Sequence, residues 1–168
     1  MKTTLRKWKI EDAQQLSEML NNQKILANLR DGLPFPYTID DAKEYIQVML
    51  DADQDQTFAY AITDEDRVIG SIGVFRKENI HFRTAELGYY IAEPDWGQGH
   101  GTRAVKQICE LIFETTDIIR IFAEPFVRNI GSGRVLEKSG FQQEGILRKN
   151  AVKNGQFEDM KLYALIRE

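Results

Sequence analysis

The chain has 168 residues, enough for one ordinary domain with a sizeable buried core. Its net charge of −4 argues against a nucleic-acid-binding surface, which would show a basic excess. The longest apolar stretches are far too short to cross a bilayer, and the first residues contain no apolar signal segment. A single cysteine and two histidines exclude an internal disulfide framework and argue against a zinc site. We therefore expect one domain, residues 1–168, in the cytoplasm, with carboxylates as the remaining candidate metal ligands.

The first third of the chain is predicted to be helical. One helix opens at Glu11 and Asp12, and its periodicity predicts a buried face made of Leu16, Met19 and Leu20. After the irregular residues 30–37, Thr38 and Asp41 form a capping pair that predicts the start of a second helix. The apolar stripe of this second helix is Ala42, Tyr45, Ile46, Met49 and Leu50.

The rest of the chain alternates between strand and helix patterns. The predicted strands are residues 57–63, 68–75, 84–92, 118–124, 141–148 and 156–167, and the predicted helices follow residue 101 and cover 129–139. Short links between the first three strands imply antiparallel neighbours, and Asn154-Gly155 predicts a hairpin turn. This order predicts an α+β fold, with helices packed on a mixed sheet.

Residues 94–105, PDWGQGHGTRAV, place a glycine at every second position between a predicted strand and a predicted helix. A helix start offers unpaired N–H groups and the positive end of the helix dipole. Glycine lets the backbone come close to a ligand. Both features favour a bound phosphate over the alternative, a sharp strand-to-helix turn without a ligand.

Two common nucleotide loops do not fit this segment. A Walker A loop needs a lysine that does not follow Gly101, and a dinucleotide fingerprint needs a third glycine where Thr102 stands. Glu124, at the end of the next predicted strand, keeps a nicotinamide-binding oxidoreductase open as an alternative. The single strand–helix–strand unit after a run of antiparallel strands argues against that alternative.

Residues 86–105, together with NIGSGRVLEKSGF at 129–141, resemble the GNAT N-acetyltransferase superfamily. Within it, the similarity is to the RimJ/RimL branch of ribosomal-protein N-terminal acetyltransferases. The signature [RQ]-x-x-G-x-[GA] falls on residues 96–101, where Trp96 replaces Arg or Gln. The resemblance implies a GNAT-type fold with a mostly antiparallel central sheet of about six to seven strands flanked by helices.

The same resemblance implies the ligands of the protein. Acetyl-CoA is the expected cosubstrate, with no metal. The acceptor is expected to be an amine, either a ribosomal or other protein N-terminus or a small molecule. No nucleic-acid or membrane partner is expected, and a homodimer is an open alternative to a monomer.

The resemblance also implies where acetyl-CoA binds. Its pyrophosphate would lie on the N–H groups of residues 97–102, and its pantetheine would pair with the end of the preceding strand, in a gap where that strand splays from the next. Arg134 and Lys138 would assist the nucleotide end, although Lys138 is equally well explained as part of a solvated helix face. The expected cofactor-binding residues are Tyr90, Ile91, Trp96, Gly97, Gln98, Gly99, His100, Gly101, Thr102, Asn129 and Arg134.

Four residues also have structural interpretations. Trp96 is expected to support the glycine turn rather than to contact the substrate. His100 and His81 are interpreted as surface loop residues, and Cys109 as a core residue without a nucleophilic role.

Direct attack of an amine on a thioester requires a neutral amine, so a proton must be removed from an α-amine, whose pKa is about 8. Glu86 is the leading candidate base because it precedes Gly88 and Tyr90 on one face of the strand that meets the cofactor. The alternative for Glu86 is a structural carboxylate that pairs with a neighbouring strand. Asp159, on a later strand, is the other candidate base.

Many members of the superfamily use a tyrosine to protonate the departing thiolate, and Leu136 stands at the matching position. Ser132 is the nearest hydroxyl and is the candidate acid, with a backbone-bonded first-turn serine as the alternative. A CoA-binding module that has lost catalysis is therefore the alternative function to an active N-acetyltransferase.

Overall fold

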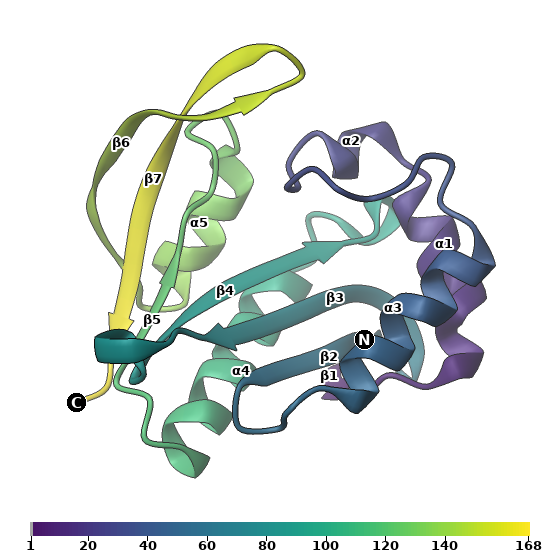
Figure 1. Ribbon diagram of the computed structural model, residues 1–168, viewed down its shortest axis with the longest axis horizontal. Helices are drawn as coiled ribbons and strands as arrows, with labels where there is room; N and C mark the ends of the chain where they lie inside the picture. Colours follow the sequence, from purple (N-terminus) through teal and green to yellow (C-terminus); the bar gives the residue numbers. More distant parts are fainter. Residues whose placement is uncertain (1) are drawn as a thin grey trace.

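In the computed structural model, which describes residues 2–168, seven strands form one sheet in the order β1-β2-β3-β4-β5-β7-β6 (Figure 1). The strands are β1 (Thr3–Arg6), β2 (Thr57–Asp64), β3 (Arg67–Arg76), β4 (Thr84–Ile91), β5 (Arg120–Ala123), β6 (Gln142–Lys153) and β7 (Gln156–Ile166). The α-helices are α1 (Ala13–Leu20), α2 (Gln23–Leu26), α3 (Ile39–Asp51), α4 (His100–Thr115) and α5 (Ile130–Lys138). Three short 3₁₀ helices, η1 (Ile10–Asp12), η2 (Asn79–His81) and η3 (Glu93–Asp95), complete the elements.

The predicted fold class is confirmed. Every strand pair is antiparallel except β4 and β5, which run parallel. The Asn154-Gly155 turn forms between β6 and β7, with both residues in the left-handed region, at φ 52° and 75°. Thr38 and Asp41 form the predicted capping box of α3.

The prediction that the first third is helical was wrong at β1. Only Leu5 among its four residues is strongly apolar, so no alternating pattern marks the segment as a strand. Its pairing with β2, and the packing of α4 against it, decide its conformation instead. The predicted stripe of α3 is correct for Ala42 and Ile46, which are buried, but Leu50 remains exposed.

Helices cover both faces of the sheet and enclose two buried clusters. On one face, α4 and α5 pack on the sheet around Ile72, Ile108, Ile121 and Leu136. On the other face, α1 and α3 pack around Trp8, Leu16 and Ile46. Cys109 lies in the first cluster, as expected, and burial raises its thiol pKa to about 12, which leaves it unreactive.

The sheet is split where its two parallel strands separate. β4 and β5 pair only from Thr84 to Glu86, against residues 120–122. β4 continues along β3 as far as Ile91, whereas β5 continues along β7 (Figure 1). Beyond Glu86, therefore, one edge of β4 faces an opening rather than another strand.

Candidate active site

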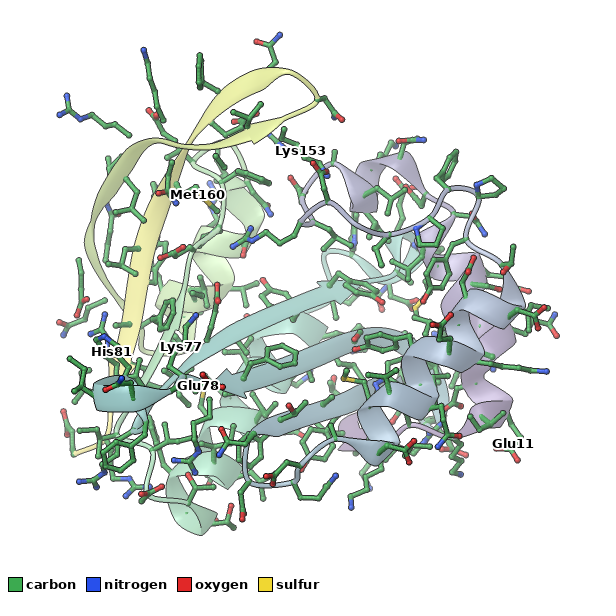
Figure 2. All side chains as sticks on the ribbon, in the orientation of Figure 1. Glu11, Lys77, Glu78, His81, Lys153 and Met160 are labelled. Carbon is green, nitrogen blue, oxygen red and sulfur yellow. The ribbon has the colours of Figure 1, made fainter. Side chains whose placement is uncertain are left out.

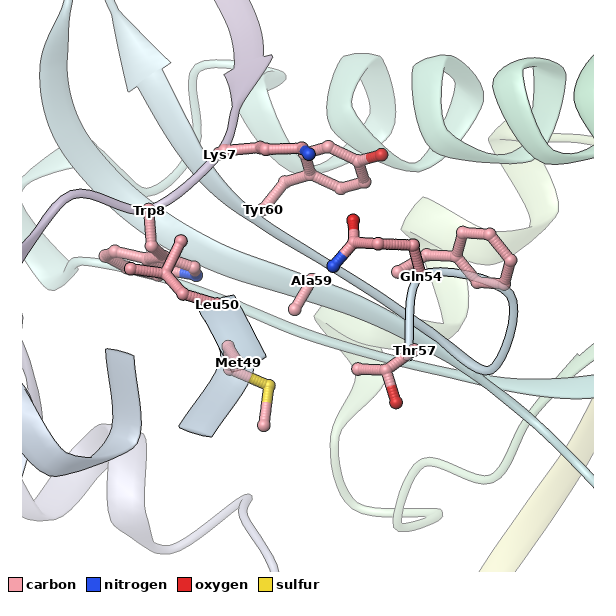
Figure 3. Close-up of a pocket in the computed structure, with 9 residues that line it drawn as sticks. Lys7, Trp8, Met49, Leu50, Gln54, Thr57, Ala59 and Tyr60 are labelled. Atoms are coloured by element: carbon pink, nitrogen blue, oxygen red, sulfur yellow. The ribbon is translucent and has the colours of Figure 1, made fainter. Parts of the chain in front are cut away.

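A cavity of about 770 Å³ fills the split between β4 and β5. Its wall combines both strand ends, the glycine segment, the first turns of α4 and α5, and residues of the α2 segment. This volume is typical of sites for small ligands and cofactors. A second cavity, of about 40 Å³, lies between α3 and β2, where Trp8, Met49 and Tyr60 line it (Figure 3), and it is too small for such a ligand.

The glycine segment ends in an uncapped helix start. Gly97 and Gly99 have φ values of 76° and 81°, in the left-handed region that glycine tolerates best. Gly99 is the N-cap of α4, and no side chain caps the helix there. The first backbone N–H groups of α4 therefore lack intrahelical partners and lie at the wall of the cavity. With the helix dipole, they form a site suited to an anion.

Trp96 and Gln98 hold the shape of this segment. The Trp96 side chain is 44% exposed, and its Nε1 donates a hydrogen bond to the Ile91 carbonyl at 2.7 Å, which ties the turn to the end of β4. Gln98 does not line the cavity; its side chain donates to the Pro94 carbonyl at 3.4 Å. Tyr90, Ile91, Gly101 and Thr102 do line it.

The interpretation of His100 as a surface residue was wrong. His100 opens α4 and is only 1% exposed, with its Nδ1 2.8 Å from Thr3 Oγ1 on β1. The helix begins immediately after Gly99, so its first side chain turns inward against β1. Burial lowers the pKa of His100, so its ring is neutral at pH 7. His81 is exposed, as expected.

The start of α5 forms the opposite wall. Asn129 caps this helix, because its Oδ1 accepts a hydrogen bond from the Ser132 backbone N–H at 3.3 Å. Arg134 and Lys138, further along the same helix, also line the cavity. Leu136 is fully buried, so it presents no group to the cavity.

Tyr89 is a site residue that the sequence reasoning missed. Its hydroxyl donates to Ser132 Oγ at 3.4 Å across the cavity wall, and burial raises its pKa to about 12. The phenol therefore remains a hydrogen-bond donor throughout the physiological pH range. Strand alternation places Tyr89 on the face opposite to Glu86 and Gly88, and only the position of α5 shows that this face also reaches the site.

Glu86 lies at the other end of the cavity, with a side chain that is 31% exposed. Its Oε2 is 3.7 Å from Arg30 Nη2, and its Oε1 is 3.6 Å from Lys77 Nζ. Figure 2 shows Lys77 beside the starts of β4 and β5. Both separations exceed normal hydrogen-bond lengths, so the two cations attract the carboxylate without occupying its oxygens.

Two further carboxylates differ in their relation to the cavity. Glu124 lines it and lies on the same face as Glu86, because it follows by two residues Phe122, the partner of Glu86 in the sheet. Asp159 does not line the cavity. Its Oδ1 accepts a hydrogen bond from the Lys149 backbone N–H at 2.7 Å, at an irregularity of β6.

Side-chain contacts join the α2 segment to the β6–β7 hairpin. Arg128 donates hydrogen bonds to Asn28 Oδ1, the Ala27 carbonyl and Glu158 Oε1, at 2.7, 2.6 and 3.0 Å. Lys153, near the tip of the β6–β7 hairpin (Figure 2), pairs with Asp31 at 2.7 Å. These contacts tie the α2 segment, which supplies Asn28 and Arg30 to the cavity wall, to the hairpin.

Within residues 2–168, no group of three or more His, Cys, Asp and Glu side chains is arranged to hold a metal ion. In the same part of the chain, no helix is long and apolar enough to cross a membrane. The expectation that the reaction needs no metal stays a prediction.

Residues 2–142 match the family described as the acetyltransferase (GNAT) domain, and the chain belongs to this family. It is 35% identical over 133 residues to the probable N-acetyltransferase YjcK of Bacillus subtilis, covering 77% of this chain and 74% of that one. It is 32% identical over 107 residues to the ribosomal-protein-serine acetyltransferase of Escherichia coli, covering 64% and 59%. A solved structure of RimL, a ribosomal L7/L12 α-N-protein acetyltransferase in complex with coenzyme A, superposes with a TM-score of 0.86 at 22% identity, covering 98% and 94%.

The protein is therefore an N-acetyltransferase, and the predicted likeness to the RimJ/RimL branch is confirmed. This family and fold replace the nicotinamide-binding alternative.

Proposed function

We propose that this protein transfers the acetyl group of acetyl-CoA directly to an α-amine, in a ternary complex held in the split between β4 and β5. One observation carries the proposal: a single cavity is lined by an uncapped helix start, by the Ser132 hydroxyl and by the Glu86 carboxylate. These are the groups that a phosphate-bearing thioester, a departing thiolate and an attacking amine require.

Acetyl-CoA is proposed to lie along the whole split. Its pyrophosphate accepts hydrogen bonds from the N–H groups of residues 97–102, and its pantetheine amides pair with the edge of β4 at Tyr90 and Ile91. Asn129 uses its Oδ1 as the helix cap, which leaves its side-chain N–H groups for the pantetheine or the thioester. Arg134 is proposed to contact the nucleotide end.

Glu86 is proposed as the base. The amine nitrogen attacks the thioester carbonyl carbon, the C–S bond breaks, and the proton lost by the amine passes to Glu86 directly or through one water. The position of Glu86 in the cavity supports this role, whereas Asp159 lies outside the cavity and is already bonded to the Lys149 backbone. The sulfur leaves as a thiolate, whose modest pKa of about 8.5 makes it a fair leaving group.

Ser132 is proposed to donate a hydrogen bond to this sulfur as negative charge develops. Tyr89 already donates to Ser132 Oγ, so the serine hydrogen is directed away from Tyr89 and its bond is strengthened. Ser132→Ala is expected to lower the turnover number about 10-fold with little change in the dissociation constant of CoA.

Tyr89→Phe is expected to give a similar loss of turnover, and the double variant no further loss, because both residues act on one hydrogen bond. Tyr60→Phe, which removes a phenol at the distant small cavity, is the matched control. Steady-state release of free CoA and calorimetric binding of CoA are the measurements. Fully additive losses in the double variant would contradict the linked action of Tyr89 and Ser132.

The charges around Glu86 support an α-amine acceptor over a polyamine. Arg30 and Lys77 flank Glu86 and repel a second ammonium group close to the reacting one. In a peptide or an amino acid, the carbon atom that bears the α-amine also bears a carbonyl or carboxylate group, and Arg30 can bind that group. Arg30→Gln is expected to lower kcat/KM about 10-fold for peptide α-amines while leaving that for spermidine unchanged or higher.

An acceptor panel tests the proposed function. Peptides with free N-termini, free amino acids, lysine side chains and polyamines compete for acetyl-CoA, and thiol release reports the transfer. Preference for peptide α-amines supports the proposal, and preference for spermidine contradicts it. CoA binding without amine-dependent thiol release from any of them would support the inactive CoA-binding module.

The proposal also covers the domain organisation, the cellular compartment and the partners of the protein. Residues 1–168 are proposed to act as one acetyltransferase domain in the cytoplasm. A homodimer is compatible with this function, and no nucleic-acid or membrane partner is required by it.

A further inference from the structure

Three side chains of α4 converge on one residue of β1. Thr3 Oγ1 lies 2.8 Å from His100 Nδ1 and 2.8 Å from Arg103 Nε, and the Thr3 carbonyl accepts a hydrogen bond from Gln107 Nε2 at 2.8 Å. The three α4 residues follow a helical spacing of three and then four, so they lie on one face of the helix. Thr3 itself is only 6% exposed.

The direction of these hydrogen bonds follows from the groups involved. The Arg103 guanidinium can only donate, so Thr3 Oγ1 accepts from it. The single hydroxyl hydrogen of Thr3 is then available for His100 Nδ1, which accepts as part of the neutral ring. The proton of that ring is then on Nε2, which lies 3.9 Å from Asp64 Oδ2, beyond hydrogen-bond distance. The hydrogen bonds therefore run in one direction: Arg103 donates to Thr3, and Thr3 donates to His100.

Arg103 also connects these hydrogen bonds to the glycine segment. Its Nη2 donates to the Gln98 carbonyl at 2.8 Å, between the two left-handed glycines. A Cβ on Gly99 would lie 2.7 Å from Arg103 Nη1, so the guanidinium covers the loop backbone at that point. The Thr3 hydroxyl thus contacts two further residues that hold the segment: His100 within the first turn of α4, and Arg103 across the loop.

We propose that Thr3 is a positioning residue for acetyl-CoA: its hydroxyl, through His100 and Arg103, fixes the N–H groups of the glycine segment in the arrangement that binds the pyrophosphate. This inference rests on the proposed function, which places the pyrophosphate there. Glycine-containing backbone has large conformational freedom, and ordering it on binding weakens the affinity. Because β1 orders the glycine segment before CoA binds, most of this loss of affinity is avoided.

The test compares two neighbouring threonines of the same strand. Thr3→Val removes the hydroxyl at nearly constant volume, and Thr3→Ser retains it. Thr4→Val is the matched control, because the Thr4 hydroxyl is bonded to Thr63 Oγ1 at 2.7 Å and strand alternation places it on the face opposite to Thr3. Calorimetric titration with CoA measures the dissociation constant, and thermal unfolding checks that each variant is folded.

Thr3→Val is expected to raise the dissociation constant of CoA about 10-fold, Thr3→Ser to restore it to within about 3-fold, and Thr4→Val to leave it unchanged. The KM for acetyl-CoA is expected to rise with Thr3→Val, whereas kcat at saturating acetyl-CoA stays near the wild-type value. A purely structural role would lower the thermal stability of Thr3→Val and leave the CoA affinity of the folded variant unchanged.

Two results would overturn the inference alone: wild-type CoA affinity in folded Thr3→Val, or an equal loss of affinity in Thr4→Val. Failure of the wild-type protein to bind CoA would contradict the proposed function, and this inference with it. The two failures are therefore distinguished by the wild-type titration.

Discussion

Glu86→Gln is expected to lower the turnover number about 100- to 1,000-fold with a peptide α-amine as acceptor. The amide has nearly the shape of the carboxylate but cannot accept the proton of the amine. The dissociation constant of CoA is expected to stay within about 2-fold of wild type, because Glu86 lies at the end of the cavity away from the glycine segment. Release of free CoA at saturating acetyl-CoA measures the turnover.

The pH dependence of this variant gives a second, independent readout. An α-amine has a pKa of about 8, so its neutral fraction rises as the pH rises towards that value. Because the variant lacks the base, its rate depends on the neutral fraction of the amine. This rate is therefore expected to increase from pH 7 to pH 9. The ratio of wild-type to variant rate should therefore shrink over this range.

Glu124→Gln is the matched control for Glu86→Gln. Glu124 lies on the same face and lines the same cavity, so the substitution makes the same charge change nearby. Its turnover is expected to stay within about 5-fold of wild type. A large loss in Glu124→Gln with a small one in Glu86→Gln would assign the base to Glu124 and contradict the role proposed for Glu86.

Gly97→Asp is expected to weaken CoA binding at least about 100-fold, because it places a carboxylate where the pyrophosphate is proposed to lie, and juxtaposed like charges cost several kcal/mol. A Cβ at Gly97 would meet no atom within 4 Å, and aspartate tolerates the left-handed backbone found there. Gly101 is a poorer choice, because a Cβ there would lie 3.3 Å from Tyr89 and 3.4 Å from Val135. Calorimetric titration with CoA measures the effect.

Gly97→Asn separates charge from shape. Asparagine has nearly the same size as aspartate and tolerates the same backbone, but it is neutral. Its affinity for CoA is expected to fall less than about 10-fold. Equal losses in the two variants would mean that steric blockage or backbone strain, and not charge, disrupts binding, and would remove the support for an anion at this position.

Local sequence patterns predicted most of the fold. Several of its signals are encoded within a few neighbouring residues: the capping pair at Thr38 and Asp41, the Asn154-Gly155 turn, and the residue patterns typical of strands. β1 carried no such signal, because its four residues are held by β2 and α4, which are distant in the sequence. Elements stabilised mainly by tertiary contacts are the ones that local patterns miss.

The site was predictable in its motifs but not in its full set of side chains. Asn129 and Ser132 belong to a recognisable segment, and both line the cavity. His100 was misplaced because the glycines around it resemble an exposed loop, whereas it is buried where α4 packs on β1, in contact with Thr3. Tyr89 was missed because strand alternation assigns it to the core, and only α5 brings a cavity-lining hydroxyl to that face.

The most direct test of acetyl transfer to an α-amine uses one peptide in two forms, with its N-terminus free or already blocked, and with a lysine in both. Each is incubated with wild-type protein and acetyl-CoA, and free CoA and peptide mass are followed together. We expect one CoA released per acetyl group gained, only with the free N-terminus and only at that amine. Equal acetylation of both forms at lysine, or CoA binding with no release from either, would contradict the proposed reaction.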